Sequence, residues 1–206
     1  MALAFILIAL IISITLHEFA HAWMGHYLGD NTAQMQGRLT LDPRAHIDPV
    51  MTVLMPLFLI IAHSPVIFGA ARPVPFNPWA VRGGKWGAAA VAAAGPFTNL
   101  LIAAFCAVWL RFVPIGGIGT EFLVTMVEIN AAFCIFNLIP FPPLDGSRLL
   151  YAVAPETLRD VMDRIEKAGL VAVFLLLFVA YPFIAPVIAK LVQGLLSLLI
   201  PGVTQL

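Results

Sequence analysis

The chain has 206 residues, of which 61% are hydrophobic and only 11% are charged, and its acidic and basic side chains balance to a net charge of zero. Globular domains carry about 25% charged residues, so this composition excludes an ordinary soluble domain and predicts an integral membrane protein. The zero net charge also provides no bulk electrostatic attraction to nucleic acid. We therefore expect the lipid bilayer to surround the chain and expect no nucleic-acid partner.

The first apolar segment, residues 2–24, is predicted to be a membrane-spanning helix, and it contains the motif His17-Glu18-Phe19-Ala20-His21. An ionisable group at the bilayer centre costs about 2.5–3.5 kcal/mol, so it is retained there only with a partner or a use. His17 and His21 lie four residues apart on one helix face, where both imidazoles can reach one tetrahedral zinc ion. Glu18 lies beside that face and can take a proton from a water molecule that the metal activates.

Two short β-strands are predicted in the polar segments that follow. Apolar and polar residues alternate over 38–41, which is typical of a half-buried strand. Closely spaced prolines exclude a helix over 72–76, and an edge strand or an extended segment fits that stretch. Between the two, residues 50–68 form an apolar segment that contains prolines, and we expect this segment to re-enter the membrane or to lie against the core.

The second half of the chain is predicted to be helical. Residues 87–112 form a long helix whose alanines and glycines permit close packing in lipid. Residues 121–139 form another apolar span, 155–167 form an amphipathic helix on a membrane face, and 168–200 form one kinked span or two short ones. The expected fold is an all-α polytopic membrane protein with five to six membrane segments, one of them re-entrant, and short strands near the active site.

The zinc ion needs a third protein ligand, and Asp145 is the best candidate. Three prolines break the span just before it, and unwound backbone at membrane depth is tolerated only where it is buried or lines a cavity. A zinc ion with two neutral imidazoles and the Asp145 carboxylate has a charge of +1, which an ionised Glu18 neutralises, and a low-dielectric site can hold such a neutral cluster. The alternative is that Asp145 caps a helix starting at Gly146.

These motifs resemble those of the site-2 protease family of intramembrane zinc metalloproteases. The resemblance is carried by HEFAH in the first helix and by NLIPFPPLDG at residues 137–146. Residues 41–49, 69–78 and 94–99 resemble further segments of the family, and the chain is most similar to its small prokaryotic branch, which has no PDZ or CBS domain. The similarity covers most of residues 1–150, the expected catalytic transmembrane core, whereas 151–206 are expected to add the amphipathic helix and the C-terminal membrane segments.

The resemblance implies a role for each motif residue and one Zn²⁺ ion per chain. The implied zinc ligands are His17, His21 and Asp145, and the implied catalytic base is Glu18. The expected substrate contacts are Asn137, Pro140 and Asn99. The implied activity is hydrolysis of peptide bonds within or next to transmembrane helices, with single-pass membrane proteins as substrates.

The depth of the two motifs predicts a topology. Both lie late in their spans, so the two spans must run parallel to meet at one zinc ion. If 50–68 is re-entrant, every basic residue except Arg111 and Lys190 falls on one side of the membrane. Basic residues gather in cytoplasmic loops, so this side is expected to be cytoplasmic, with the zinc site nearer to it and the protein in the plasma membrane.

Three alternatives remain from the residues alone. A CaaX-type membrane zinc protease also has HExxH in a helix but usually takes a glutamate as its third ligand, for which Glu121 and Glu128 are candidates. A metal or proton carrier would use the two histidines with His63 and Glu128, and would need neither Glu18 nor the turn at Asp145. A catalytically silent scaffold is the third alternative, and the intact motif argues against it.

Overall fold

The structure is a computed structural model that describes residues 2–55, 58, 61, 71–112, 116–169, 171–172 and 179–201. Throughout this part of the chain, all regular secondary structure is helical. The centre of the fold consists of α1 (Ala2–Tyr27), α4 (Gly84–Phe112) and α5 (Gly117–Asn137). All three are long and apolar enough to cross a membrane, which confirms the predicted all-α polytopic class.

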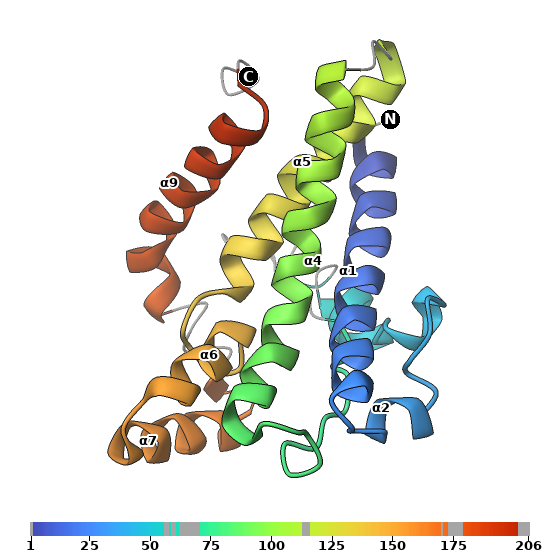
Figure 1. Ribbon diagram of the computed structural model, residues 1–206. Helices are drawn as coiled ribbons and strands as arrows, with labels where there is room; N and C mark the ends of the chain where they lie inside the picture. Colours follow the sequence, from blue (N-terminus) through green and yellow to red (C-terminus); the bar gives the residue numbers. More distant parts are fainter. Residues whose placement is uncertain are drawn as a thin grey trace.

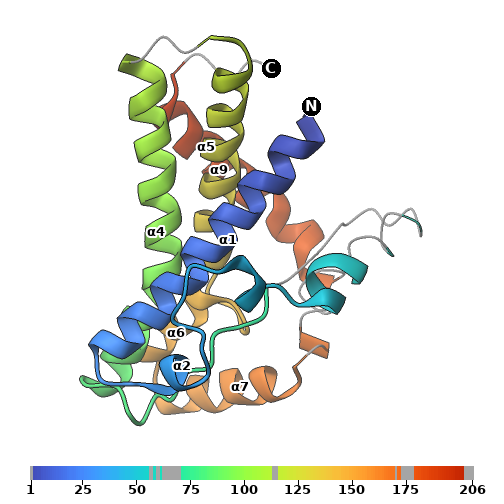
Figure 2. The same cartoon turned by 90° about the vertical axis from the view of Figure 1, so that its right-hand side faces the viewer.

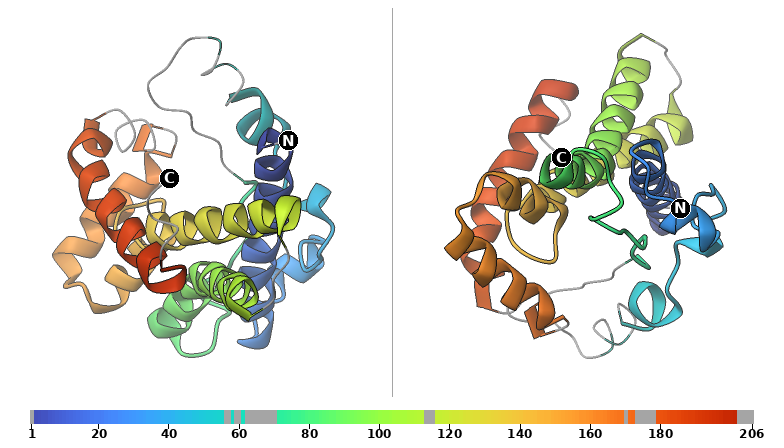
Figure 3. Two further views of the ribbon diagram at one scale, coloured as in Figure 1. Left: turned by 90° about the horizontal axis from the view of Figure 1, so that it is seen from above. Right: turned by 60° about the horizontal axis from the view of Figure 1, so that its bottom comes forward.

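Shorter helices surround this centre. They are α2 (Thr32–Met35), the 3₁₀ turn η1 (Pro43–Ala45), the π-helical turn η2 (Pro49–Leu54), α6 (Asp145–Val153), α7 (Glu156–Lys167) and α9 (Tyr181–Leu199). The charged helix α7 agrees with the amphipathic helix predicted from the sequence. The apolar helix α9 packs against α5, on the side of the bundle opposite to α1 (Figure 3). Part of the predicted segment 168–200 lies outside the described residues.

Small side chains allow the three central helices to approach one another closely. The buried face of α4 consists mainly of alanine and glycine. Ala9 of α1, Ala103 of α4 and Val127 of α5 are fully buried in one apolar cluster. Helices in lipid associate through van der Waals contact of this kind, because lipid tails are as apolar as the side chains they would replace. The alanine-rich sequence of α4 thus explains its close contact with both α1 and α5 (Figure 1).

The central helices alternate in direction. α1 runs from the upper end of the bundle to the lower end, α4 returns upward, and α5 runs downward again (Figures 1 and 2). α1 and α5 are therefore parallel, as the depth of the two motifs predicts. Both carry their functional motif toward the same, lower end of the bundle, where α2, α6 and α7 also lie.

In the connection between α1 and α4, the residues before and after the apolar segment 50–68 lie next to each other. The backbone N–H of Arg72 donates to the carbonyl oxygen of His46 at 2.9 Å, so the two residues that flank the apolar segment 50–68 are adjacent. A single full crossing by that segment would separate them by the thickness of a membrane. Apart from η2 and a few isolated residues, 50–68 lies outside the described residues, so its predicted re-entrant path stays a prediction.

The short β-strand predicted over 38–41 is wrong, and of the two alternatives for 72–76 the edge strand is wrong. Residues 38–41 form a bend, and residues 71–77 are extended but pair with no strand of the described chain. Side chains form hydrogen bonds with the backbone of residues 71–77 that a neighbouring strand would otherwise form. The Arg38 guanidinium donates to two consecutive carbonyl oxygens of this extended segment, at 2.5 and 3.0 Å. The alternation over 38–41 is therefore not that of a half-buried strand, because the polar Arg38 is the buried residue and the apolar Leu41 is exposed.

Asp30 holds the far end of the extended segment. Its Oδ2 atom accepts from the backbone N–H of Asn77 at 2.7 Å, and its Oδ1 atom accepts from Thr32. Burial acts to raise the pKa of Asp30, but the hydrogen bonds from Asn77 and Thr32 favour the carboxylate and hold the pKa below its usual value. An ionised carboxylate therefore ties residues 71–77 to the end of α1.

This topology predicts the sidedness of two loops. In a protein whose native Cys106 and Cys134 have been replaced, single cysteines from Gln34→Cys and Lys85→Cys should both react with a membrane-impermeant thiol reagent from the same side of oriented vesicles. Ile118→Cys, an exposed position at the opposite end of the bundle, is the control and should react from the other side. Labelling of Gln34→Cys and Lys85→Cys from opposite sides would contradict this topology.

Candidate metal centre

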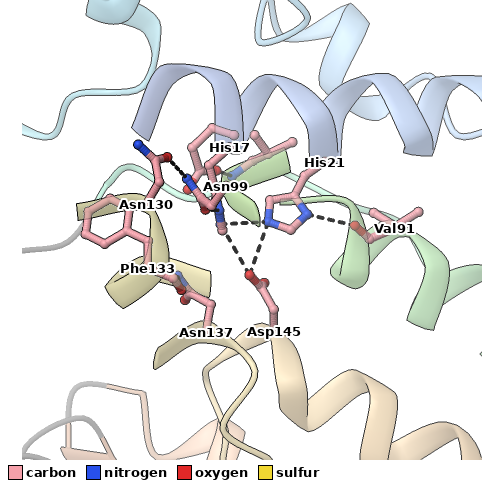
Figure 4. Close-up of polar contacts among 10 residues, drawn as sticks. His17, His21, Val91, Asn99, Asn130, Phe133, Asn137 and Asp145 are labelled. Atoms are coloured by element: carbon pink, nitrogen blue, oxygen red, sulfur yellow. Dashed lines mark hydrogen bonds and ion pairs between the residues drawn. The ribbon is translucent and has the colours of Figure 1, made fainter. Parts of the chain in front are cut away.

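Three side chains converge at the lower end of the bundle (Figure 4). The Nε2 atoms of His17 and His21 lie 3.0 Å apart, and they lie 3.2 and 3.3 Å from Oδ2 of Asp145. Ligands bound at about 2.0–2.1 Å to a tetrahedral zinc ion are separated by about 3.3–3.4 Å. The three atoms therefore form a triangle close to one face of a zinc tetrahedron. They are the only such group of potential metal ligands among the described residues.

The protonation of these atoms supports a cation between them. Nδ1 of His21 lies 2.7 Å from the carbonyl oxygen of Val91, which can only accept, so Nδ1 carries a proton. Nδ1 of His17 lies 2.6 Å from Oδ1 of Asn99, which also accepts. In the neutral form of both rings each Nε2 atom therefore presents a lone pair, and the buried Oδ2 of Asp145 faces both of them. Three facing lone pairs repel one another unless a cation joins them, so the residues fit a zinc ion.

Local backbone features bring Asp145 to the histidines. A proline-rich turn after α5 reverses the chain into α6, of which Asp145 is the first residue. A Cβ atom on Gly146 would overlap the carbonyl oxygen of Leu138, so only glycine lets α6 start this close to the end of α5. The N-cap position of α6 is taken by Leu144, and Asp145 is already helical. The capping alternative is therefore wrong.

α4 forms the wall of the site, and glycine makes this possible. A Cβ atom on Gly95 would lie 2.7 Å from Nε2 of His17 and still closer to Nε2 of His21. The sequence reasoning assigned this glycine only to helix packing and missed its contact with the metal-binding atoms. The signal that was available is the Gly95-Pro96 pair inside a long helix, where neither residue favours helix formation.

Glu18 lies next to the triangle but is not part of it. Its side chain is half-buried, and Oε2 accepts from the backbone N–H of Val74 at 3.2 Å. The extended segment 71–77 is therefore anchored to the carboxylate that the sequence predicts as the base. Oε1 receives no hydrogen bond from the described residues and has lone pairs to accept a proton.

The three predicted substrate-contacting residues have different surroundings. Asn137 is half-buried beside Asp145, and its amide donates to the carbonyl oxygen of Phe133 at 3.1 Å (Figure 4). Pro140 is exposed. Asn99 is fully buried, and both its polar side-chain atoms are used, by His17 and by Asn130. In this structure Asn99 therefore supports His17, a predicted zinc ligand, and its contact with substrate stays a prediction.

The alternative ligands do not reach the site. Glu121 and Glu128 are exposed on α5, and neither joins the two histidines. The glutamate-ligand arrangement of a CaaX-type protease is therefore wrong for this chain. His63, which the carrier alternative requires, lies outside the described residues.

An HExxH helix and an aspartate from a later helix, joined among apolar membrane-length helices, define a membrane-embedded metal-dependent hydrolase. Comparison with known proteins agrees with this class. Residues 115–180 match the family model described as Peptidase family M50. The matched region contains Asp145, whereas the HExxH motif lies before it. The chain therefore belongs to peptidase family M50, the site-2 protease family, and is a multi-pass membrane zinc metalloprotease, as the two sequence motifs predict.

Individual relatives extend the similarity to most of the chain. The chain is 37% identical over 186 residues to the Bacillus subtilis (strain 168) protein named "Putative zinc metalloprotease YwhC", an alignment that covers 85% of this chain and 80% of the relative. It is 30% identical over 179 residues to the Mycobacterium tuberculosis (strain ATCC 25618 / H37Rv) protein named "Putative zinc metalloprotease Rip2", with coverage of 85% and 65%. No solved structure matches.

The contact between Gly95 and the two histidines predicts that Gly95→Ala weakens zinc binding. Overpacking costs about 1–3 kcal/mol, so the zinc affinity measured by chelator competition should fall about tenfold or more. Gly194→Ala is the matched control, because Gly194 is also helical but a Cβ atom added there would meet no other atom within 4 Å. A wild-type zinc affinity in Gly95→Ala would show that α4 does not contact the metal site.

Proposed function

We propose that this protein hydrolyses peptide bonds within or next to the transmembrane helices of other membrane proteins. The supporting observation is the depth of the three converging side chains. His17 precedes the end of α1 at Tyr27 by ten residues, which is about 15 Å of helix rise. Trp23 and Tyr27 stack on each other and are exposed near that end, as is typical of aromatic residues at a membrane–water boundary. The reacting bond would therefore lie inside the apolar layer.

The chain's own residues account for the hydrolysis. His17, His21 and Asp145 would hold the zinc ion, which, when bound, polarises the scissile carbonyl and lowers the pKa of a coordinated water. Glu18 takes a proton from the attacking water on its free Oε1 and passes this proton to the leaving amine. The hydrogen bond from Val74 to Oε2 keeps the Glu18 carboxylate oriented during this transfer.

A transmembrane substrate must unwind before it is cut, because helical hydrogen bonds hold its peptide groups. We propose that the extended segment 71–77, which touches Glu18, lies alongside the unwound substrate and offers backbone groups to it. Asn137 and Pro140, in the turn that leads to Asp145, are proposed as further contacts. The partners are accordingly single-pass membrane proteins.

We propose the plasma membrane as the location, with the lower end of the bundle in the cytoplasm. The segments that lead into α4 and those that follow α5 both lie at this end. Together they contain every basic residue of the chain except Arg111, at the far end of α4, and Lys190, within α9. Basic loops favour the cytoplasmic side, which would place the metal site nearer the cytoplasmic face.

Metal analysis of purified variants tests the site. The wild-type protein should carry about one zinc ion per chain, and His17→Ala, His21→Ala and Asp145→Ala should each lose it. Glu18→Gln should keep the zinc ion but lose about 10²–10⁴-fold in hydrolysis rate, because only proton transfer is removed. Full zinc occupancy in Asp145→Ala would assign the third ligand to another residue.

Reconstituted protein tests the substrate class. A single-pass helix should be cut within its apolar span, and helix-breaking residues near the cut should accelerate cleavage, because they lower the cost of unwinding. The Glu18→Gln variant is the control for contaminating proteases. If the wild-type protein degrades soluble casein as fast as the membrane helix, and Glu18→Gln degrades neither, the protein is a zinc protease without preference for membrane substrates.

A further inference from the structure

A line of buried polar side chains crosses the apolar bundle above the metal site. It contains Ser13 of α1, Asn130 of α5 and Asn99 of α4, and all three are fully buried. Nδ2 of Asn99 donates to Oδ1 of Asn130 at 2.7 Å, and Nδ2 of Asn130 donates to Oγ of Ser13 at 2.8 Å. The line ends at His17, whose Nδ1 lies 2.6 Å from Oδ1 of Asn99 (Figure 4). Nothing in the proposed chemistry uses Ser13 or Asn130.

The carbonyl oxygen of Met126 determines which group donates and which accepts in each of these hydrogen bonds. Nδ2 of Asn130 also lies 2.8 Å from the carbonyl oxygen of Met126, which can only accept a hydrogen bond. The amide nitrogen of Asn130 must therefore face Met126, and its oxygen must face Asn99. The amide of Asn99 then turns its nitrogen to Asn130 and its oxygen to His17. His17 must carry its proton on Nδ1, which leaves the lone pair on Nε2.

We propose that Asn130 is a positioning residue for the zinc site, acting through Asn99 to select the His17 tautomer that can bind metal. This proposal rests on His17 being a zinc ligand. Without Asn130, the Asn99 amide can turn over and offer its N–H groups to Nδ1 of His17. Nδ1 would then accept, the proton would move to Nε2, and His17 would present a donor to the metal. Groups that orient metal-bound histidines typically contribute 10–100-fold to metal affinity.

Ser13 has a different role in the same line. A hydroxyl group can donate or accept, so Ser13 cannot determine which way the Asn130 amide points. It only satisfies the second N–H of that amide in surroundings where an unpaired polar group is costly. The proposal therefore separates two residues that touch each other: removal of Asn130 should change the His17 tautomer, whereas removal of Ser13 should not.

The test uses the full-length protein in two states. In the metal-free protein with ¹⁵N-labelled histidine, the NMR signals of His17, assigned by their loss in His17→Ala, report which ring nitrogen carries the proton. In the same preparations, chelator competition gives the zinc affinity. The variants are Asn130→Leu, which removes both polar atoms, Asn130→Asp, which keeps an acceptor for Asn99, and Ser13→Ala. Thr125→Val is the matched control, because it removes a side-chain bond to the carbonyl four residues earlier in α5 without touching the line.

We expect wild-type protein, Ser13→Ala, Asn130→Asp and Thr125→Val to carry the proton of His17 on Nδ1. Asn130→Leu should show Nδ1 of His17 without a proton and a zinc affinity about 10–100-fold lower. A proton on Nδ1 and a wild-type affinity in Asn130→Leu would overturn the proposal. If Asn130→Leu fails to fold, an Nδ1 without a proton in wild-type protein or in Asn130→Asp would overturn it. Because the tautomer is observed without metal, this result is independent of whether His17→Ala loses zinc.

Discussion

The metal centre depends on three lone pairs that meet inside an apolar bundle. Nε2 of His17, Nε2 of His21 and Oδ2 of Asp145 lie within 3.3 Å of one another, and with both rings neutral each atom presents a lone pair to the other two. Such an arrangement is repulsive by itself and becomes favourable around a cation. The surrounding residues hold the three atoms in place. This role explains why α4 has Gly95 and the buried Asn99, which packing alone would not require.

α4 contributes to the site without providing a ligand. The carbonyl oxygen of Val91 orients one histidine, Asn99 orients the other, and Gly95 leaves room for both rings between them. These three residues lie four positions apart in succession, so they occupy one face of the helix. The two histidines of α1 are also four residues apart. The matching spacing lets each histidine meet its own partner on α4, so the two helices form the site together.

The lower end of the bundle joins the site to the polar segments. Parallel α1 and α5 bring their motifs to that end, and the extended segment 71–77 reaches Glu18 there. Side chains of Arg38 and Asp30 hold this segment in place of a neighbouring strand. Its edge therefore remains close to Glu18, the proposed base, where the proposed unwound substrate would need partners for its peptide groups.

The sequence by itself determined what depends on local spacing and composition. The apolar spans, the pairing of His17 with His21 and the candidacy of Asp145 follow from hydropathy, helical periodicity and charge balance. Only the tertiary structure decided the hydrogen-bond partners. Asn99 lies 82 positions from His17, and the strands expected near 38–41 and 72–76 are replaced by side-chain contacts. Alternating polarity did not show that Arg38 is buried and Leu41 exposed, because long-range packing decides which side chains are buried and what each buried polar atom touches.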